Sequence, residues 1–269
     1  MQTFDPECVG RHNAGAMPDS VDARILAKRL MDEWDFSPTR ELKGGYCSVL
    51  FSDGCRVLKA PFQGEELTTG RIAAERMSGG AGPVVHRSDK DSGALLMDQI
   101  APGEDLSRYG LSDREALPVF FDLAGQIRGL ETEGLMPMSE FLDSNIPFIS
   151  RLIQTSPEGV FLHGDLHHYN VLWGGGRWWA IDPKGLVGDP AFEAVAFLRN
   201  PFDRFDEVDD LPGFLSSRIQ ALASGLRVDA SRVWAWSLAD RICSDAADDH
   251  PWGRMRKALE ALSPAFGGR

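Results

Sequence analysis

The sequence is poor in cysteine, and its few cysteines are not spaced as metal ligands. Cys8, Cys47, Cys55 and Cys243 are the four cysteines of the 269-residue chain, and no two of them form a C-x-x-C pair. A zinc ribbon and a dense disulfide framework are therefore not indicated. We expect these side chains to be reduced and partly buried, like other small apolar residues.

The sequence also lacks an uninterrupted apolar run long enough to cross a bilayer. The N-terminal segment MQTFDPECVGRHNAG does not combine a basic region with an apolar stretch, as a secretory signal would. These absences predict a cytoplasmic protein without a membrane partner.

Basic residues are outnumbered: 28 lysines and arginines face 40 aspartates and glutamates, for a formal net charge of -12. This balance disfavours binding to nucleic acid or to anionic membranes by plain electrostatics. It would attract a cationic small molecule, although the same charge also serves solubility. The hydrophobic fraction of 43% is sufficient for a sizeable core.

Two common catalytic motifs are missing. No G-x-x-x-x-G-K-[ST] segment is present, which excludes a P-loop ATPase on motif grounds. No G-x-S-x-G segment is present either, which disfavours an α/β-hydrolase.

The N-terminal third is predicted to be a small, mostly antiparallel sheet with helices beside it. After a polar arm, a helix is expected from Ser20, with an apolar stripe of Val21, Ile25, Leu26, Leu30 and Trp34. Residues 46–51 and 55–59 predict a hairpin around Asp53-Gly54. A helix over residues 65–77 and two further strands at 83–86 and 94–100 follow.

From residue 102 onward the pattern is mainly helical. Ser112 and Glu115 have the spacing of a capping box, which predicts the start of a helix that runs toward Glu133. Pro118 predicts that this helix is kinked or starts later. Further helices are expected over 141–155 and after Asp229, where Val233, Trp236, Asp240, Cys243 and Ala247 share a stripe. We expect an arm and helix over 1–35, a sheet-containing N-terminal lobe (N-lobe) over 36–101 and a helical C-terminal lobe (C-lobe) over 102–269.

The segment richest in chemistry is His163-Gly164-Asp165-Leu166-His167-His168-Tyr169-Asn170, followed by Ile181-Asp182-Pro183-Lys184-Gly185. An Asp, an Asn five residues later and a second Asp after a short hairpin are spaced as in kinase-like sites for phosphoryl transfer. Asp165 can accept the proton of an attacking hydroxyl. Asn170 and Asp182 offer the oxygen ligands that Mg²⁺ prefers.

Upstream residues complete a nucleotide site in the expected chain order. Lys59, at the end of its predicted strand, can hold the phosphates of ATP, and Gly44 and Gly45 allow close approach of the backbone. The lobe-joining segment, where backbone groups would bind adenine, is Met97, Asp98, Gln99 and Ile100. Each of these features is weak alone, because a lysine at a strand end is usually a solvated charge. Their common order along the chain favours a kinase.

At these residues a family resemblance becomes specific. The segments His163–Leu172 and Ala180–Pro190, with Ala94–Gln99 and Asn200-Pro201, resemble the streptomycin kinase and hydroxyurea phosphotransferase branch of the aminoglycoside phosphotransferases. In weaker form the likeness extends from about residue 36 to the C-terminus. It implies an α+β, two-lobed, protein-kinase-like fold, with a small antiparallel-sheet N-lobe and a mainly helical C-lobe.

The resemblance also implies residue roles, with ATP and Mg²⁺ as cofactors. Asp165 would be the base, Asn170 and Asp182 the metal ligands, and Lys59 the phosphate anchor, oriented by Glu66 or, as second choice, Glu65. Two positions depart from the family pattern. Asp98 replaces the usual Glu, and Glu193 replaces an Asp that supports the catalytic loop in many relatives.

The histidines allow a second interpretation. His163, His167 and His168 could form a zinc site, but Gly164 and Asp165 interrupt the helix that this spacing would need. We expect His163 to support the loop backbone instead.

The substrate side is predicted from the remaining polar residues. His167, His168 and Lys184 are expected to border the acceptor, and Asp240 and Asp245 to pair with its cationic groups.

The predicted activity is O-phosphorylation of streptomycin by a monomer or weak homodimer, in antibiotic resistance. The alternatives are another small hydroxyl compound, such as hydroxyurea or a sugar metabolite, and a catalytically silent nucleotide-binding regulator.

Overall fold

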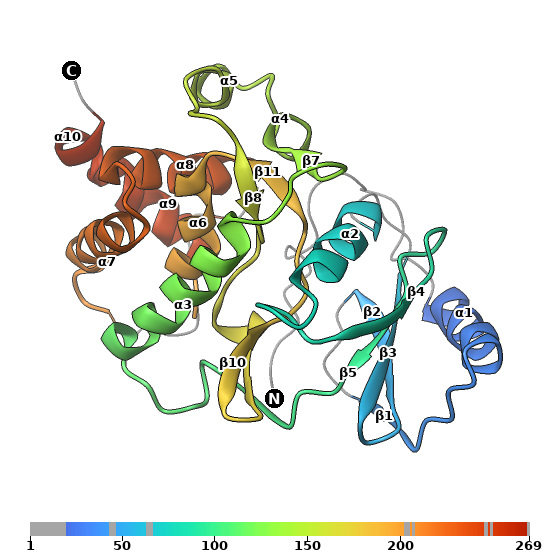
Figure 1. Ribbon diagram of the computed structural model, residues 1–269. Helices are drawn as coiled ribbons and strands as arrows, with labels where there is room; N and C mark the ends of the chain where they lie inside the picture. The colour runs from blue at the N-terminus through green and yellow to red at the C-terminus, as the bar shows by residue number, and fades with distance from the viewer. Residues whose placement is uncertain are drawn as a thin grey trace.

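The protein has two lobes, one built on an antiparallel sheet and one mainly helical, as predicted (Figure 1). The computed structural model describes residues 20–42, 47–62, 67–201, 205, 208–244, 247 and 250–267. Among these residues, no helix combines the length and the apolar character needed to cross a membrane.

The N-lobe sheet has five strands, and every neighbouring pair is antiparallel. The strands are β1 (Arg40–Leu42), β2 (Ser48–Ser52), β3 (Arg56–Pro61), β4 (Val85–Ser88) and β5 (Leu95–Asp98), in the order β1-β2-β3-β5-β4. Lys59 lies on the central strand β3, opposite Leu50 and Leu95.

The predicted hairpin exists, but its turn is shifted by one residue. The N–H of Asp53 donates to the carbonyl of Arg56 at 3.2 Å, so Gly54 and Cys55 form the tip. Gly54 has a φ of +100°, a conformation that glycine adopts without steric cost. The predicted partial burial is wrong for Cys47 and Cys55, which are both exposed.

Helix α1 (Ser20–Glu33) packs on this sheet through a face that overlaps the predicted stripe only in part, at Leu26 and Leu30. Ala23, Ala27 and Leu30 are buried, whereas Ile25 is 64% exposed. The buried face contacts the sheet core that contains Leu58. The two alanines let the helix approach the sheet closely, and a stripe chosen for large apolar residues leaves them out and wrongly includes Ile25.

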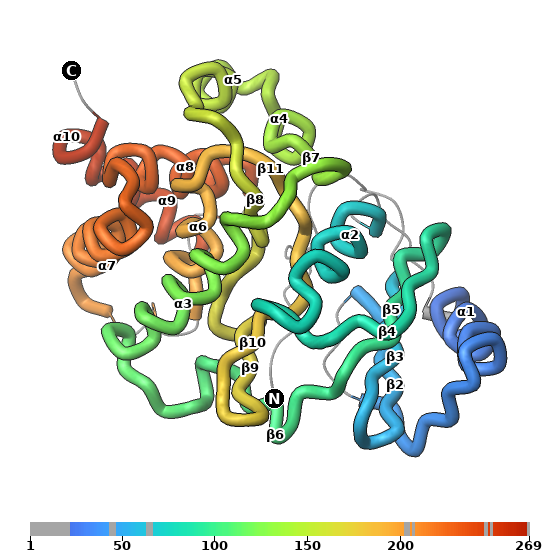
Figure 2. The backbone as a smooth tube through the Cα atoms, in the orientation of Figure 1, coloured from blue at the N-terminus to red at the C-terminus, as the bar shows by residue number. Residues whose placement is uncertain are grey.

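Helix α2 (Leu67–Met77) lies between the sheet and the C-lobe (Figure 2). Ala73 and Met77 belong to the large C-lobe core. At the start of the helix, Thr69 Oγ1 donates to the carbonyl of Lys184 at 2.8 Å. Beyond its end, the carbonyl of Ala81 accepts the N–H of Ala180 at 2.7 Å. The helix is therefore fixed to the two segments that flank Asp182.

The C-lobe packs helices around two small sheets. The helices are α3 (Asp113–Arg128), α4 (Met138–Phe141), α5 (Pro147–Gln154), α6 (Glu193–Leu198), α7 (Leu211–Leu226), α8 (Ala230–Cys243), α9 (Pro251–Ala261) and α10 (Ser263–Phe266). The strands are β6 (Pro102–Asp105), β7 (Met136–Pro137), β8 (Val160–Leu162), β9 (Val171–Gly174), β10 (Arg177–Ala180) and β11 (Leu186–Gly188). They pair in the orders β10-β9-β6 and β7-β11-β8.

Several predicted helix bounds need correction. The capping box of Ser112 is confirmed, and α3 starts at once and ends at Arg128. The exposed position of Pro118 lets the carbonyl that loses its helical partner face water. The helix predicted over 141–155 is confirmed only as α5, which starts at Pro147, because α4 ends at Phe141 and the residues between the two are not helical. The Asp229 cap of α8 is confirmed, but Ala247 lies beyond the end of the helix.

The chain passes from the N-lobe sheet to a C-lobe sheet between β5 and β6. The boundary predicted after residue 101 falls in this connection, and the division into 1–35, 36–101 and 102–269 stays a prediction. Most of the predicted arm, residues 1–19, lies outside the described residues.

Close contact between α2 and the segment after Asp182 makes Gly185 sensitive to substitution. Its φ is +72°, and a Cβ there would lie 2.3 Å from the carbonyl oxygen of Thr69. Gly176 has a similar φ of +82°, but a Cβ added there would meet no atom within 4 Å. We predict that Gly176→Ala costs about 1 kcal/mol of unfolding free energy from backbone strain. Gly185→Ala should cost roughly 1 to 3 kcal/mol more from overpacking.

Urea denaturation of the two alanine variants and the wild type measures this difference. Equal losses of unfolding free energy in the two variants would show that α2 does not pack closely against Gly185.

Candidate active site

A buried histidine joins the two loops that carry the predicted reacting residues. The ring of His163 accepts the N–H of Asp165 at Nδ1, 3.2 Å away, and its Nε2 lies 3.0 Å from the carbonyl oxygen of Ile181. This network assigns the ring proton to Nε2. Burial lowers the pKa of His163 to about 4, although the Asp165 charge opposes this. The imidazole is therefore neutral and structural, and its predicted support of the loop backbone is confirmed.

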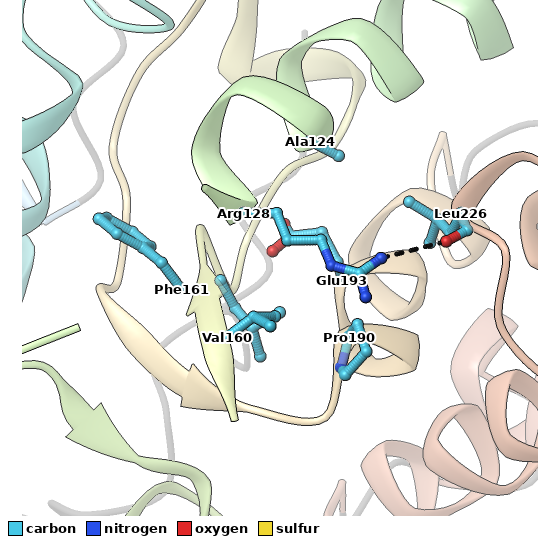
Figure 3. Close-up of a pocket in the computed structure, with 8 residues that line it drawn as sticks. Ala124, Arg128, Val160, Phe161, Pro190, Glu193 and Leu226 are labelled. Atoms are coloured by element: carbon cyan, nitrogen blue, oxygen red, sulfur yellow. Dashed lines mark hydrogen bonds between the residues drawn. The ribbon is translucent and has the colours of Figure 1, made fainter. Parts of the chain in front are cut away.

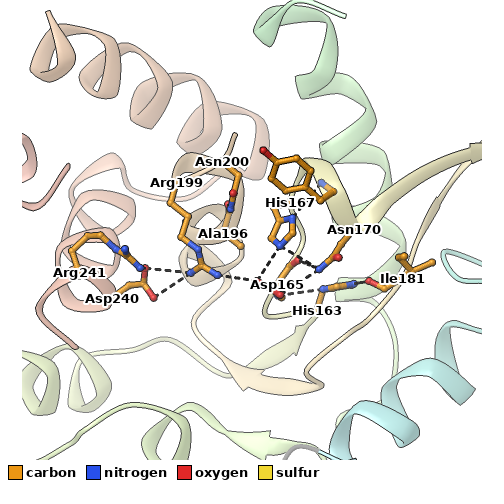
Figure 4. Close-up of polar contacts among 11 residues, drawn as sticks. His163, Asp165, His167, Asn170, Ile181, Ala196, Arg199, Asn200, Asp240 and Arg241 are labelled. Atoms are coloured by element: carbon orange, nitrogen blue, oxygen red, sulfur yellow. Dashed lines mark hydrogen bonds and ion pairs between the residues drawn. The ribbon is translucent and has the colours of Figure 1, made fainter. Parts of the chain in front are cut away.

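Asp165 lies in the loop between β8 and β9, where polar groups approach both of its carboxylate oxygens (Figure 4). Arg199 Nη2 donates to Oδ1 at 2.8 Å, and His167 Nε2 lies 3.5 Å from the same oxygen. Asn170 Nδ2 lies 3.3 Å from Oδ2. Burial opposes ionisation, but His167, Lys184 and Arg199 outweigh it and hold the pKa of Asp165 well below its ordinary value. The group is a carboxylate at neutral pH.

Asn170 and Asp182 present oxygen atoms that suit a hard cation. Asn170 Nδ2 donates to the carbonyl of Asp165 at 3.0 Å, so its amide oxygen is the atom open to a metal. Among the described residues, no three His, Cys, Asp or Glu side chains converge as a metal cluster. Mg²⁺ does not need such a cluster, because it is commonly held by one or two carboxylates together with substrate phosphates and water. The donor set therefore fits Mg²⁺.

Lys59 reaches Asp182 from the N-lobe. Its Nζ lies 2.6 Å from Asp182 Oδ1, and although burial opposes it, this cation lowers the pKa of Asp182. Asp182 has a φ of +58°, a conformation that residues other than glycine adopt rarely and that often marks functional sites. Glu65 and Glu66, the predicted partners of Lys59, lie outside the described residues, as do Gly44 and Gly45.

The predicted adenine segment crosses from β5 toward the C-lobe. The N–H of Asp98 donates to the carbonyl of Val84, and the N–H of Gln99 donates to that of Cys55. Met97 pairs with neighbours on both sides of β5. The N–H groups of Asp98 and Gln99 are therefore already bonded within the protein, and the adenine-binding role of this segment stays a prediction.

The structure divides the predicted substrate residues. His167 lies beside Asp165, and the charge of Lys184 also acts on Asp165. The prediction for His168 is wrong, because its side chain is 3% exposed and its ring stacks on Phe197 in the core. Asp240 is 15% exposed and already paired with Arg199 and Arg241, whose charges lower its pKa against the effect of burial. Asp245 lies outside the described residues.

Glu193 supports the loop that carries Asp165, although it replaces the Asp of the family pattern. Its Oε2 accepts the N–H of His163 at 2.8 Å. Figure 3 shows it with Arg128 at a small cavity lined largely by apolar side chains. Burial raises the pKa of Glu193 to about 8, although the N–H groups of His163 and Gly164 lower it. The longer side chain therefore reaches the loop from α6.

Sequence reasoning missed Arg199 entirely. It directly follows α6 and contacts both Asp165 and Asp240. The only local signal was its position beside the Asn200-Pro201 pair that contributed to the family resemblance.

The raised pKa of Glu193 predicts a dependence of stability on pH. The folded protein holds a proton on Glu193 up to about pH 8, whereas the unfolded chain releases it near the ordinary value. Stability should therefore fall as pH rises through this window, by up to about 1.4 kcal/mol per pH unit. Glu193→Gln keeps an acceptor for the loop but cannot ionise, so it should gain stability relative to wild type between mildly acidic and alkaline pH.

Thermal melts of both proteins across this pH range measure the effect, with Glu140→Gln as an exposed control. Parallel curves for wild type and Glu193→Gln would contradict the assignment.

Comparison with known proteins agrees with this geometry. The family model described as aminoglycoside/hydroxyurea antibiotic resistance kinase matches residues 140–250. Streptomycin 6-kinase of Streptomyces griseus is 27% identical, with 89% of this chain and 85% of the relative covered. Streptomycin 3''-kinase of Klebsiella pneumoniae is 31% identical over 55% of this chain and 64% of the relative. Hydroxyurea phosphotransferase of Kitasatospora aureofaciens is 30% identical over 71% of this chain and 61% of the relative.

Solved structures show the same fold at low identity. A choline/ethanolamine kinase family protein from Mesorhizobium loti superposes with a TM-score of 0.62 at 15% identity, covering 93% of this chain and 97% of that one. A thermostable mutant of aminoglycoside phosphotransferase APH(4)-Ia, in complex with ADP and hygromycin B, has a TM-score of 0.54 at 15% identity, covering 91% and 99%. The predicted two-lobed, kinase-like α+β fold is confirmed. The family model and the curated relatives support the resemblance to the aminoglycoside phosphotransferase superfamily, in the branch of streptomycin kinases and hydroxyurea phosphotransferases.

Proposed function

We propose that the protein is an ATP-dependent kinase that phosphorylates a hydroxyl of an aminoglycoside, with streptomycin as the leading acceptor. The observation that carries this proposal is the convergence of Lys59, Asp165, Asn170 and Asp182. Lys59 contacts Asp182 at 2.6 Å, Asn170 contacts Asp165 at 3.3 Å, and His163 joins the segments that carry Asp165 and Asp182.

In the proposed reaction, Asp165 receives the acceptor hydroxyl through a carboxylate oxygen. The acceptor oxygen forms a bond to the γ-phosphorus, and the bond from that phosphorus to the β–γ bridging oxygen breaks. The leaving ADP keeps the electron pair of that bond, and the hydroxyl proton passes to Asp165. The lowered pKa of Asp165 makes it a weak base. Its main contribution is therefore to orient the nucleophile, as in other phosphoryl transfers dominated by positioning.

The metal site would be formed by the amide oxygen of Asn170 and the carboxylate of Asp182. Mg²⁺, when bound, neutralises charge on the nucleotide phosphates. The ammonium group of Lys59 pairs with Asp182. When a nucleotide is bound, this ammonium group would pair with the phosphates instead. The backbone of Asp98 and Ile100 would bind the adenine edge.

Support for streptomycin comes from the names of the relatives and from the net charge of -12. Asp240 was predicted to pair with the cationic groups of streptomycin. It gives this acceptor less support, because its carboxylate is already paired with two arginines. Hydroxyurea is the second candidate, since a hydroxyurea phosphotransferase is 30% identical over 71% of this chain.

Two isosteric variants should separate chemistry from nucleotide binding. Asp165→Asn should lower turnover at least about 100-fold, because orienting and accepting the hydroxyl proton is lost. It should keep the thermal shift caused by Mg-ATP, since a ligand that binds the folded state stabilises it. Asp182→Asn should lose turnover and also the magnesium-dependent part of that shift.

Steady-state kinetics and thermal melts measure these two effects, with Asp91→Asn on an exposed turn as control. If Mg-ATP does not change the melting temperature of the wild type, the kinase assignment is wrong. Binding without turnover of any acceptor would favour the silent regulator.

The acceptor is tested by supplying labelled ATP with streptomycin or hydroxyurea and identifying products by mass spectrometry. We predict phosphorylated streptomycin, and a KM for streptomycin that rises with salt, because long-range attraction is screened over roughly 8 to 10 Å near physiological ionic strength. The KM for the neutral hydroxyurea should change little. Efficient turnover of another acceptor without any streptomycin product would contradict the substrate and leave the kinase activity standing.

A further inference from the structure

Alternating charges connect helix α8 to the catalytic loop (Figure 4). Arg241 Nη2 lies 2.7 Å from Asp240 Oδ2, and both residues belong to α8. Arg199 Nη1 lies 3.2 Å from Asp240 Oδ1, and its Nη2 lies 2.8 Å from Asp165 Oδ1. The proposed base is thus the last member of an ion-pair chain that starts on a C-terminal helix.

The guanidinium of Arg199 is held from two sides. One nitrogen faces Asp165 and the other faces both oxygens of Asp240, at 3.2 and 3.3 Å. The three side chains are 15 to 21% exposed, so bulk solvent screens these contacts less than those on the surface. A planar guanidinium that is fixed along two edges imposes a direction on its partners, which a lysine ammonium would not.

The backbone around Arg199 is anchored by a second arginine. Arg218, from α7, is 4% exposed and donates to the carbonyls of Leu198 at 2.9 Å and Asn200 at 3.0 Å. Asn200 also donates to the carbonyl of Ala196 at 2.9 Å. The position from which Arg199 reaches the loop is therefore set by buried hydrogen bonds, and not by the ion pair alone.

At the other end, the contacts of Asp165 are divided between its oxygens. Oδ1 receives Arg199, and Oδ2 faces Asn170. Two donors on different oxygens restrict rotation of the carboxylate plane, and each oxygen retains a lone pair for a further donor. Without Arg199, Oδ1 would lose its donor at 2.8 Å, whereas Asn170 and the more distant His167 would still contact the carboxylate.

We propose that Arg199 is a positioning residue for phosphoryl transfer: supported by Asp240, its guanidinium holds the Asp165 carboxylate in the orientation that receives the acceptor hydroxyl. This inference rests on the proposed kinase function. It adds to the reaction a residue from outside the catalytic loop and the metal-binding segment. The alternative is that Arg199 only packs α6 against α8.

Arginine variants distinguish the two roles. Arg199→Ala should lower kcat about 100-fold, since a small misplacement of a reacting group has an effect of this size. The KM values for ATP and acceptor should stay within about threefold, because substrate binding is not removed. Arg199→Lys should recover part of kcat, and Asp240→Asn should show a smaller loss of kcat.

Arg232→Ala is the matched control. Arg232, an arginine of α8, is 23% exposed and pairs with the buried Asp189 instead of with Asp165. It should lose stability while keeping kcat within about threefold, because it does not orient the base.

Chemical rescue gives the sharpest test. Millimolar guanidinium chloride should restore part of the kcat of Arg199→Ala, because the free ion fits between the two carboxylates. Urea at the same concentration, similar in shape but uncharged, should not restore it, and neither should sodium chloride. If Arg199 had only a packing role, guanidinium would not raise the kcat of Arg199→Ala, because this ion destabilises folded proteins.

Failure of this inference differs from failure of the kinase function. If the wild type transfers phosphate but Arg199→Ala keeps its kcat, or guanidinium does not raise it, the positioning role is wrong. If the wild type turns over no acceptor, the kinase function is wrong instead. Crystal structures of Arg199→Ala with and without guanidinium then still decide the positioning role. An Asp165 carboxylate in its wild-type orientation without guanidinium would overturn it.

Discussion

A single uncharged imidazole sets the distance between the loops that carry Asp165 and Asp182. His163 bonds to the backbone of Asp165 on one side and to the carbonyl of Ile181 on the other. This bridge requires one ring nitrogen to accept, so it depends on a neutral ring, and complete burial keeps the ring neutral. Glu193 holds the N–H of the same residue from α6. The geometry of the site therefore depends on a core residue that need not touch a substrate.

Asp165 and Asp182, the two candidate site carboxylates, share a second property, because each is paired with a cation from a distant part of the chain. Lys59 from the N-lobe sheet pairs with Asp182, and Arg199 from the end of α6 pairs with Asp165. Partly buried charges are costly unless paired. These pairs favour the charged form of both carboxylates. They also mean that the acidic character of the chain does not produce a strongly negative surface at Asp165.

The parts predictable from sequence were those encoded by short spacing. The contact of Asp165 with Asn170 lies within six residues of one loop, and the capping box of Ser112 lies within four residues. The wrong predictions depended on packing between distant segments.

His168 is next to His167 in sequence, but the 3-10 turn over His168–Asn170 directs it into the core against Phe197. Arg199 could not be found, because its partners lie 34 and 41 residues away on other elements. Asp240 was placed near the site, yet its arginine partners, and hence its available charge, were not predictable.

Helix α2 is an N-lobe element by sequence, but its fixed contacts are with the C-lobe. Thr69 binds the carbonyl of Lys184, and Ala81 binds Ala180, so the helix is clamped on both sides of Asp182. Its contacts with the sheet include polar side chains, such as Ser88 to Glu75. A rotation of the sheet about the 99–101 connection would move Lys59 relative to Asp182 and would break their ion pair. The same rotation would slide the sheet past α2, which is bound to the C-lobe by these two contacts.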